Sequence, residues 1–332
     1  IFARFKVASC PREDLVGTCF VIWTTTPWTM PGNRAMACGA DIAYSALKIN
    51  EVAEGSLAQV GEVICLADEL REAVFTETGI LNADVVTRFT GAEIAGSVAR
   101  HPLATQGYDH DVPLFLADYV TTEQGTGFVH IAPGHGPEDY AIAHLQHGVE
   151  VPDTVGEDGV IADHLPLFGG MHVLRDNQKI ADIMAEHGGL IGVGILVHSY
   201  PHSWRSQAPV IYRNAAQWFV SMGDGAEQGK GLRATALDAL QQTDFYPASG
   251  QKRLSSMIEN RPDWCLSRQR AWGVPIPVFY HKQTGEPLRD QAVVDRIVNA
   301  FAEEGCDAWF TSPAARFLGP DYDEADYVQV KD

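Results

Sequence analysis

The chain has 332 residues, of which 45% are hydrophobic, and its formal net charge at pH 7 is −19. That length is enough for about two globular domains. The apolar runs, such as 194–197 and 274–280, are far shorter than the roughly 20 residues of a membrane helix, so no membrane partner is expected. The six cysteines show no CxxC spacing and the N-terminus shows no secretion signal, which favours a reducing, cytoplasmic location.

The acidic charge is not spread evenly along the chain. Residues 196–282 carry 10 basic and 6 acidic side chains, whereas the segments on either side are both acidic. Contacts to nucleic-acid phosphates depend on lysine and arginine, so only this middle block is suited to them. Overall acidity is also an ordinary way for a protein to remain in solution.

Short segments rich in valine, isoleucine and aromatic residues dominate the first half of the chain. Strands are predicted at 16–23, 43–49, 59–66, 113–120 and 127–131. Helices are predicted between and after them, at 67–77, 137–147, 174–187, 232–243 and 249–260. The order lacks a regular βαβ rhythm, and it contains neither GxGxxG nor GxxxxGK[ST]. An α+β fold with a barrel-like sheet is therefore favoured over a doubly wound sheet.

The stretch WTTTPWTMPGN (23–33) follows the apolar run CFVI. Threonine and tryptophan favour strands, whereas proline removes a backbone donor and ends the ladder. A strand is therefore expected to end here, with a group of hydroxyls at its mouth.

The stretch GTGFVHIAPGHGPEDYA (125–141) predicts a second chemical feature. A strand leads into His130, a loop with Pro133, Gly134 and Gly136 follows, and Pro137 opens a helix whose first turn carries Asp139. The compact loop would bring a histidine and a carboxylate near one another. Asp139 should stay ionised because a helix N-terminus favours negative charge, although first-turn acids often have no other role.

Four blocks in this order resemble isoleucyl-tRNA synthetases, and the likeness extends over essentially the whole chain. They are WTTTPWTMPGN (23–33), GTGFVHIAPGHGPEDY (125–140), SYPHSWRSQAPVIYRNAAQWFVSM (199–222) and NRPDWCLSRQRAWGVPIP (260–277). The related valyl and leucyl enzymes characteristically have arginine at the position of Thr26 and an acidic residue at that of Trp28. They usually have aspartate at the position of Gly136. The isoleucine family therefore fits best.

The resemblance implies a fragment of a longer synthetase. The HIGH and KMSKS signatures for activation with ATP and Mg do not occur, so these cofactors are expected only for the full-length parent. The matching parts are a β-barrel-like editing domain with flanking helices at 1–197 and a mixed α/β junction returning to the catalytic core at 198–280. A partial second insertion follows at 281–332. The expected partners are the 3′-CCA end of tRNA(Ile) carrying valine and the remainder of the synthetase chain.

The family's editing reaction hydrolyses a misattached valyl ester without cofactor or metal. By resemblance, Thr24, Thr25, Thr26 and Asn33 line the editing pocket, and Thr29 is a weaker candidate. Asp139 matches the position that captures the α-ammonium group, and His130 the position that limits side-chain size.

Direct attack by water is expected, because GxSxG is absent. The sequence leaves open whether His130, a threonine hydroxyl or the ribose hydroxyl of the substrate accepts the proton.

Candidate tRNA contacts lie in the basic block, at Arg205, Arg213, Arg268 and Arg270. They could face phosphates or pair with the catalytic core instead. Two other functions also stay open. One is valyl-type editing of Thr-tRNA(Val), against which Trp28 and Gly136 argue. The other is a non-catalytic tRNA-binding insert, which the threonine cluster and Asp139 disfavour.

Overall fold

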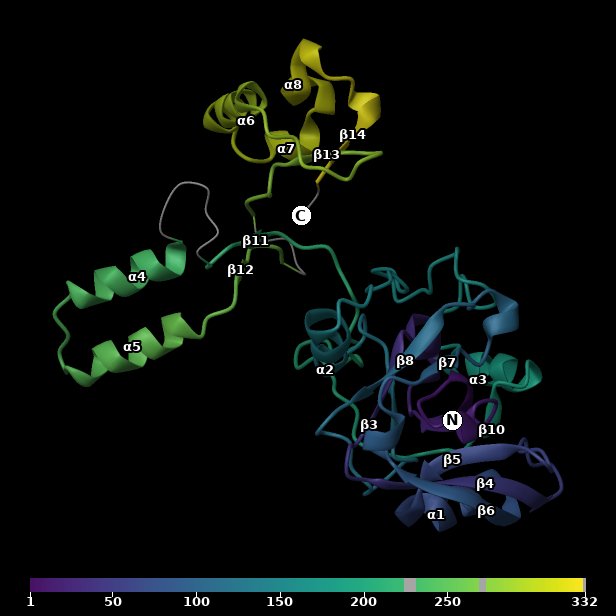
Figure 1. Cartoon of the computed structure of the whole chain (residues 1–332). Coiled ribbons are helices and arrows are strands. Elements are labelled where there is room, and N and C mark those ends of the chain that lie inside the picture. Colours follow the sequence, from purple (N-terminus) through teal and green to yellow (C-terminus); the bar gives the residue numbers. More distant parts are fainter. Residues whose placement is uncertain (224–230, 269–272, 331–332) are drawn as a thin grey trace. The chain divides into compact units, whose positions relative to one another are not determined.

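The structure is a computed structural model that describes residues 1–223, 231–268 and 273–330. The chain separates into two compact units, Ile1–Ala215 and Ala216–Asp332, and each is described by itself (Figure 1). The predicted domain limits at 197 and 280 stay predictions. Within the described ranges no helix is long and apolar enough to cross a membrane.

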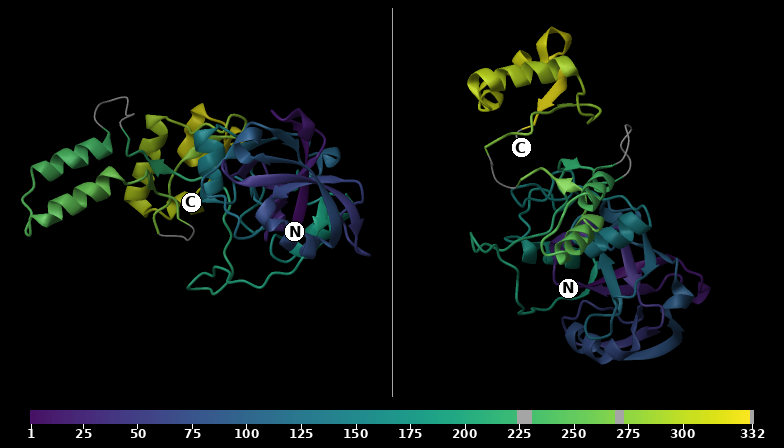
Figure 2. Two further views of the ribbon diagram at one scale, coloured as in Figure 1. Left: turned by 60° about the horizontal axis from the view of Figure 1, so that its bottom comes forward. Right: turned by 90° about the vertical axis from the view of Figure 1, so that its left-hand side faces the viewer.

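Ten strands of the first unit form one mixed sheet, coloured purple to teal in Figures 1 and 2. Its order is β6-β4-β5-β2-β1-β7-β8-β3-β9, with β10 paired to β1. Two pairs, β2 with β5 and β3 with β8, are parallel, and the rest are antiparallel. The strands are β1 (Phe2–Ser9), β2 (Cys19–Trp23), β3 (Ala35–Cys38), β4 (Ala43–Val52), β5 (Val63–Ala67), β6 (Ile80–Thr90), β7 (Val98–Arg100), β8 (Asp111–Leu116), β9 (Phe128–Ile131) and β10 (Leu190–Gly192).

Short helices interrupt the sheet. The α-helices are α1 (Arg71–Thr78), α2 (Pro137–Tyr140) and α3 (Asn177–Glu186), and the 3₁₀ helices include η2 (Pro27–Gly32) and η4 (Gly91–Ile94). α2 continues as a π-helix at Ala141–Gln146. The predicted α+β class is confirmed. Among the described strands β6 and β9 end the pairing order, so hydrogen bonds do not close the sheet into a complete barrel.

The core of this unit is built from strands that are buried on both faces. All four residues of β3 are buried, as are four of the five in β2. Phe128 stacks on Phe20 with 4.8 Å between ring centroids and lies 4.6 Å from the Tyr44 ring. Because each fully buried aromatic of this kind stabilises the fold by about 1.5–3 kcal/mol, this cluster fixes β9, and with it the start of the loop after His130.

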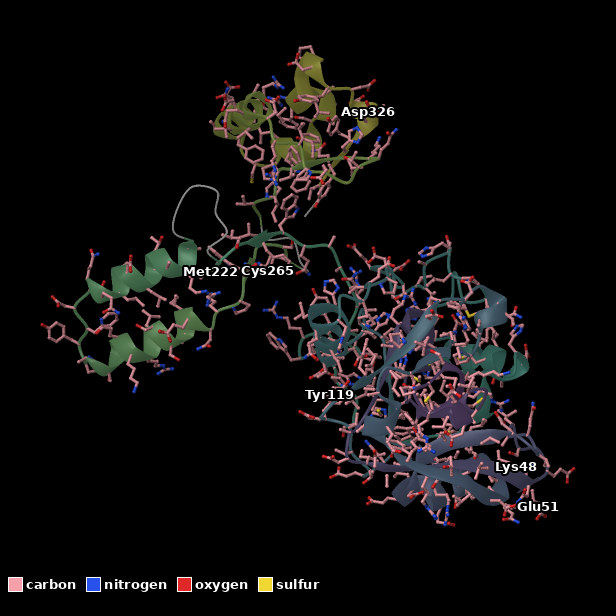
Figure 3. The ribbon with its side chains drawn as sticks, in the orientation of Figure 1. Lys48, Glu51, Tyr119, Met222, Cys265 and Asp326 are labelled. Atoms are coloured by element: carbon pink, nitrogen blue, oxygen red, sulfur yellow. The ribbon has the colours of Figure 1, made fainter. Side chains whose placement is uncertain are left out.

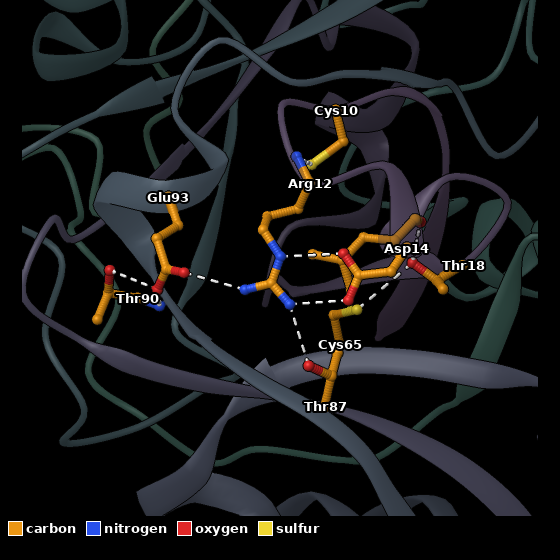
Figure 4. Close-up of polar contacts among 9 residues, drawn as sticks. Cys10, Arg12, Asp14, Thr18, Cys65, Thr87, Thr90 and Glu93 are labelled. Atoms are coloured by element: carbon orange, nitrogen blue, oxygen red, sulfur yellow. Dashed lines mark hydrogen bonds and ion pairs between the residues drawn. The ribbon is translucent and has the colours of Figure 1, made fainter.

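Arg12 connects the end of β1 to the β6 side of the sheet (Figure 4). Its guanidinium donates to both carboxylate oxygens of Asp14 at 2.9 and 2.7 Å, to Glu93 at 3.0 Å and to the Thr87 hydroxyl at 3.1 Å. Glu93 also accepts the main-chain N–H of Thr90 and so caps η4. Bidentate geometry of this kind fixes orientation more firmly than a single contact.

The five predicted strands and five predicted helices all correspond to observed elements with shifted ends. In the first unit, strands β1, β3, β6, β7 and β10 were not predicted. They are short, or they carry polar residues that weaken the alternating pattern, as in β6 (ILNADVVTRFT).

The second unit contains a helix pair and a separate small core. The pair is α4 (Leu232–Gln241) and α5 (Ser249–Glu259), and the strands β11 (Phe219–Val220) and β12 (Trp264–Cys265) pair antiparallel. The small core surrounds Trp309 and Phe317, both fully buried. Its elements are β13 (Phe279–His281), α6 (Gln291–Glu304), α7 (Ala308–Thr311), α8 (Ala314–Leu318) and β14 (Tyr327–Gln329).

Candidate functional site

The threonine stretch begins where β2 ends at Trp23. Pro27 follows as the first residue of η2, and Pro31 lies inside it, so neither residue donates a backbone hydrogen bond. The main-chain N–H of Thr26 donates to the Thr24 hydroxyl at 3.1 Å. This local turn ends the ladder and turns the threonines toward a cavity, as the sequence predicts for a strand stopped by proline.

The second stretch brings His130 and Asp139 to the same cavity. β9 pairs antiparallel with β3, and this register sets His130 opposite Met36. Gly136 is extended and Pro137 opens α2, so Asp139 lies in the first helical turn. The Asp139 Oδ2 atom accepts the main-chain N–H of Ala132 at 2.8 Å, which fixes the carboxylate across the loop.

These residues line a cavity of about 310 Å³, which we call the Asp139 cavity. It lies at the lower end of the usual range for ligand pockets, roughly 300–1,000 Å³. Five of the seven predicted editing residues contribute to its wall. The complete lining is Thr24, Thr26, Trp28, Thr29, His130, Ala132, His135, Asp139, Tyr200, Pro201, Val210, Ile211 and Tyr212.

Asn33 lies behind the cavity wall and not in it. Its side chain is fully buried, and its Nδ2 atom donates to the Ala35 carbonyl at 2.9 Å and to His130 Nδ1 at 2.8 Å. A flipped amide would place oxygen against the Ala35 carbonyl oxygen, so the carbonyl fixes its orientation. Asn33 therefore acts on the cavity through His130.

The two ring nitrogens of His130 are both occupied. Because Nδ1 accepts from Asn33, the ring proton lies on Nε2, which is 2.9 Å from the Thr29 hydroxyl. That hydroxyl donates in turn to the Thr26 carbonyl at 2.8 Å. Burial lowers the pKa of His130 to about 3, so the ring is neutral at pH 7.

Asp139 is shielded from water in its cavity. Burial raises its pKa to about 6, and this outweighs the hydrogen bond from Ala132, which acts in the opposite direction. The position of Asp139 at a helix N-terminus predicts a carboxylate that stays fully ionised. The carboxylate is still predominantly ionised at pH 7, but it gains a proton in mild acid.

Thr25 does not line the Asp139 cavity. It is exposed, and it borders two neighbouring cavities, of about 290 and about 630 Å³. Tyr119, labelled in Figure 3, lines the smaller of these together with Phe128 and Gly127. Thr24 is shared by all three. Phe128 is buried in the aromatic core and does not line the Asp139 cavity.

Comparison with known proteins identifies the family. The model of the class I tRNA synthetases (I, L, M and V) matches residues 27–332. The chain belongs to this family. Its relatives include the isoleucine–tRNA ligases of Gluconobacter oxydans (46% identical), Pelagibacter ubique (42%) and Caulobacter vibrioides (44%). Each match covers 100% of this chain but only 35–36% of the relative, so the chain spans about a third of their length. These matches confirm the resemblance to isoleucyl-tRNA synthetases.

Two solved structures are also similar to this class I synthetase chain. The crystal structure of GlLeuRS-CP1 aligns with 54% of this chain and 84% of its own, at 16% identity and a TM-score of 0.42. The crystal structure of the P.knowlesi cytosolic leucyl-tRNA synthetase editing domain aligns with 57% of this chain and 94% of its own, at 10% identity and a TM-score of 0.41.

Part of the cavity wall comes from the segment 200–212, which lies in the predicted junction and not in the predicted editing domain. The cavity wall includes Tyr200, Pro201 and the run 210–212 together with the threonines. His135 holds this segment in place, because its Nδ1 atom donates to the Tyr212 carbonyl at 3.0 Å. The Thr154 hydroxyl donates to His135 Nε2 at 2.7 Å. Neither nitrogen of His135 is thus free for a metal, and the described residues hold no group of three or more potential metal ligands.

The four predicted tRNA-binding arginines occupy different settings. Arg213 lies within 3.6 Å of Glu157 and also contacts the carbonyls of Val155 and Asn214. The Arg205 guanidinium lies 4.6 Å from the Trp204 ring centroid. Arg268 donates to the carbonyls of residues 265–267. Arg270 lies outside the described residues. A role of these arginines in tRNA binding stays a prediction.

Proposed function

We propose that this chain is the editing part of an isoleucyl-tRNA synthetase and that it hydrolyses misacylated Val-tRNA(Ile). One observation carries the proposal: the half-buried Asp139 carboxylate shares a cavity of about 310 Å³ with the hydroxyls of Thr24 and Thr26. A carboxylate opposite hydroxyl donors fits the two ends of an aminoacyl ester, namely its ammonium group and its carbonyl and ribose oxygens.

Asp139 would bind the α-ammonium group of the ester. Its Oδ2 atom already accepts one hydrogen bond from Ala132, which leaves the other carboxylate oxygen for the ligand. A charge-assisted hydrogen bond is stronger than a neutral one and fixes direction, so it orients the ester as well as binding it. The shielding that raises the pKa of Asp139 also strengthens the attraction to a bound cation.

Size would separate valine from isoleucine. One methylene adds only about 1–3 kcal/mol to binding in a hydrophobic pocket, a general limit that isoleucyl-tRNA synthetases are commonly used to illustrate. A small second cavity that excludes the larger side chain supplies the missing discrimination. His130 is suited to form its rigid wall, because both ring nitrogens are held by Asn33 and Thr29.

The three candidate proton acceptors differ in whether their hydrogen bonds leave them able to accept the proton of the attacking water. His130 has no free lone pair in this arrangement, so it is poorly suited to act as the general base. The Thr29 hydroxyl donates its proton to the Thr26 carbonyl and so has no proton left for the ester. The Thr24 hydroxyl accepts the Thr26 main-chain N–H, so its own proton can be donated to an ester oxygen. The Thr26 hydroxyl lies 3.4 Å from the Thr25 hydroxyl, and either of the two can donate to the other or to the ester. A threonine hydroxyl or the substrate's ribose hydroxyl is thus left to assist the attacking water.

The remaining expectations follow from the family. The full-length parent would ligate isoleucine to tRNA(Ile) with ATP and Mg in the cytoplasm, whereas editing would need no cofactor or metal. The partners would be the 3′-CCA end of tRNA(Ile) carrying valine and the rest of the synthetase chain. Arg205, Arg213, Arg268 and Arg270 are the candidate tRNA contacts.

Initial rates of hydrolysis of Val-tRNA(Ile), Ile-tRNA(Ile) and Thr-tRNA(Val) by the purified chain test the proposal. Faster release of valine than of isoleucine or threonine is expected. Preference for Thr-tRNA(Val) would favour the valyl-type alternative. Binding of all three without hydrolysis would favour a non-catalytic insert.

A further inference from the structure

Two histidines outside the predicted site contact the main chain of the segment that carries Thr29 and Asn33. His101 directly follows β7 and His110 directly precedes β8, so both lie at the ends of one connecting loop. Each contacts a backbone carbonyl of the segment 29–33, which we call the threonine arm. The lining of the Asp139 cavity includes neither histidine.

The orientation of the His101 ring is fixed by hydrogen bonds at both of its nitrogens. Its Nδ1 atom accepts the main-chain N–H of Leu103 at 3.1 Å, so its proton lies on Nε2 and is donated to the Met30 carbonyl at 3.0 Å. The ring is 2% exposed and stacks on Tyr108 with 4.9 Å between centroids. Burial lowers its pKa to about 3, which keeps the donor in the neutral form at pH 7.

His110 holds the other end of the arm. Its Nε2 atom lies 2.9 Å from the Asn33 carbonyl, which also accepts from the Arg34 guanidinium at 2.7 Å. The Arg34 guanidinium is also 3.4 Å from His110 Nε2, but the closer carbonyl requires the ring proton there, so that longer contact is not a hydrogen bond.

The threonine arm depends on such outside contacts. Pro27 and Pro31 cannot donate within η2, and 3₁₀ geometry gives weaker internal hydrogen bonds than an α-helix. The two carbonyls that the histidines contact, those of Met30 and Asn33, are at the two ends of the backbone from 30 to 33. Thr29 and Asn33 in turn hold both nitrogens of His130, so a shift of the arm would move the cavity wall.

We propose that His101 and His110 are positioning residues for the deacylation reaction, holding the threonine arm and His130 in register with Asp139. This inference rests on the proposed function. The two histidines act through the Met30 and Asn33 carbonyls and do not touch the ester. Their loss should therefore lower kcat, which depends on alignment, more than it raises KM, because misplacement by about 1 Å can cost on the order of 100-fold in rate.

The test compares donor-free and donor-keeping variants of the same chain. His110→Ala and His101→Phe remove the donated proton, whereas His110→Gln and His101→Gln keep an N–H that can reach the carbonyl. His164→Ala, at an exposed histidine of the same unit, serves as the matched control. Steady-state deacylation of Val-tRNA(Ile) is measured for each folded variant, and the ¹⁵N shifts of the His130 ring report its tautomer at pH 7.

The expected result is a roughly 10- to 100-fold loss of kcat in the donor-free variants, with KM within about twofold and partial rescue by glutamine. The His130 resonances should show a proton on Nε2 in the wild type and a mixed or shifted state in the donor-free variants. Unchanged kcat and unchanged His130 shifts in both donor-free variants would overturn the inference. An inactive wild type would contradict the proposed function instead, and the His130 shifts would still decide whether the two histidines position the wall.

Discussion

His130 Nε2 lies 2.9 Å from the Thr29 hydroxyl, and this contact joins the two stretches that the sequence singled out, 101 residues apart. Asn33 completes the arrangement by donating to the other ring nitrogen at 2.8 Å. His130 is therefore a neutral side chain in the wall of the Asp139 cavity, and neither ring nitrogen has a free lone pair to accept a proton. The threonine hydroxyls also differ: Thr29 donates its proton to the Thr26 carbonyl at 2.8 Å, whereas the contact of the Thr26 hydroxyl with the Thr25 hydroxyl is long, at 3.4 Å.

Removal of the His130 ring should be costly to the fold. His130→Ala opens a void and removes one hydrogen-bond partner each from the Asn33 amide and the Thr29 hydroxyl, so the free energy of unfolding should fall by about 2–4 kcal/mol. Urea unfolding at pH 7 measures this, with the exposed His164→Ala as control, for which a change within about 0.5 kcal/mol is expected. Equal midpoints for the two variants would mean that the His130 contacts contribute little.

The adjacent threonines Thr25 and Thr26 allow a finer comparison. Thr26→Val removes the hydroxyl in the Asp139 cavity and keeps the shape, so kcat for Val-tRNA(Ile) should fall by about 10- to 100-fold. Thr25→Val should have a smaller effect, because Thr25 is exposed and lies outside this cavity. A larger loss for Thr25→Val would place the reacting ester in one of the two neighbouring cavities that Thr25 borders, of about 290 and about 630 Å³.

The rate of editing should depend on pH through Asp139. Its pKa is raised to about 6, so the fraction of ionised carboxylate, and with it kcat/KM, should rise as the pH increases from 5 to 7. Initial rates corrected for spontaneous ester hydrolysis give the profile. Glu138→Gln should keep an acid limb but shift it to lower pH, because the negative charge of the exposed Glu138 helps to raise the pKa of Asp139. A rate that is flat between pH 5 and 7 would exclude Asp139 as the titrating group.

Acid should also weaken the fold. The pKa values of His101 and His130 are lowered from 6.5 to about 3, so below pH 6.5 the unfolded chain binds more protons than the folded one. Stability from these groups is complete above pH 6.5 and is lost as the pH falls toward 3. The pKa of Asp139 is raised from 3.8 to about 6, so between pH 6 and 3.8 the folded chain binds this proton more tightly than the unfolded one. This gain in stability offsets the loss from one of the two histidines in that range.

We therefore expect the free energy of unfolding at pH 5 to be roughly 3 kcal/mol lower than at pH 7. Urea midpoints at the two values, measured under matched ionic strength, give the difference. His101→Gln removes one of the two buried histidines, so it should reduce the pH dependence. Equal stability at pH 5 and 7 would contradict the buried, neutral state of both rings.

The sequence predicted the local features of the site better than its long-range contacts. Prolines mark where β2 ends, and the Pro137 turn places Asp139, because both depend on nearby residues. The support of His130 by Asn33 depends on the pairing of β3 with β9, and β3 is four small or flexible residues without a clear pattern. Tyr200 and Tyr212 reach the cavity only through tertiary contacts such as that of His135, for which the sequence offers no signal.

The most direct test of the account is the rate of Val-tRNA(Ile) hydrolysis by Asp139→Asn beside the wild type, Glu138→Gln and Ile-tRNA(Ile). Asparagine keeps an acceptor for the Ala132 N–H and removes the charge, so it separates ammonium binding from structure. We predict that wild type and Glu138→Gln release valine faster than isoleucine, and that Asp139→Asn, although folded, loses about 100-fold or more in kcat/KM. Full activity of Asp139→Asn, or equal attack by the wild type on both esters, would contradict the assignment of this cavity as a selective editing site.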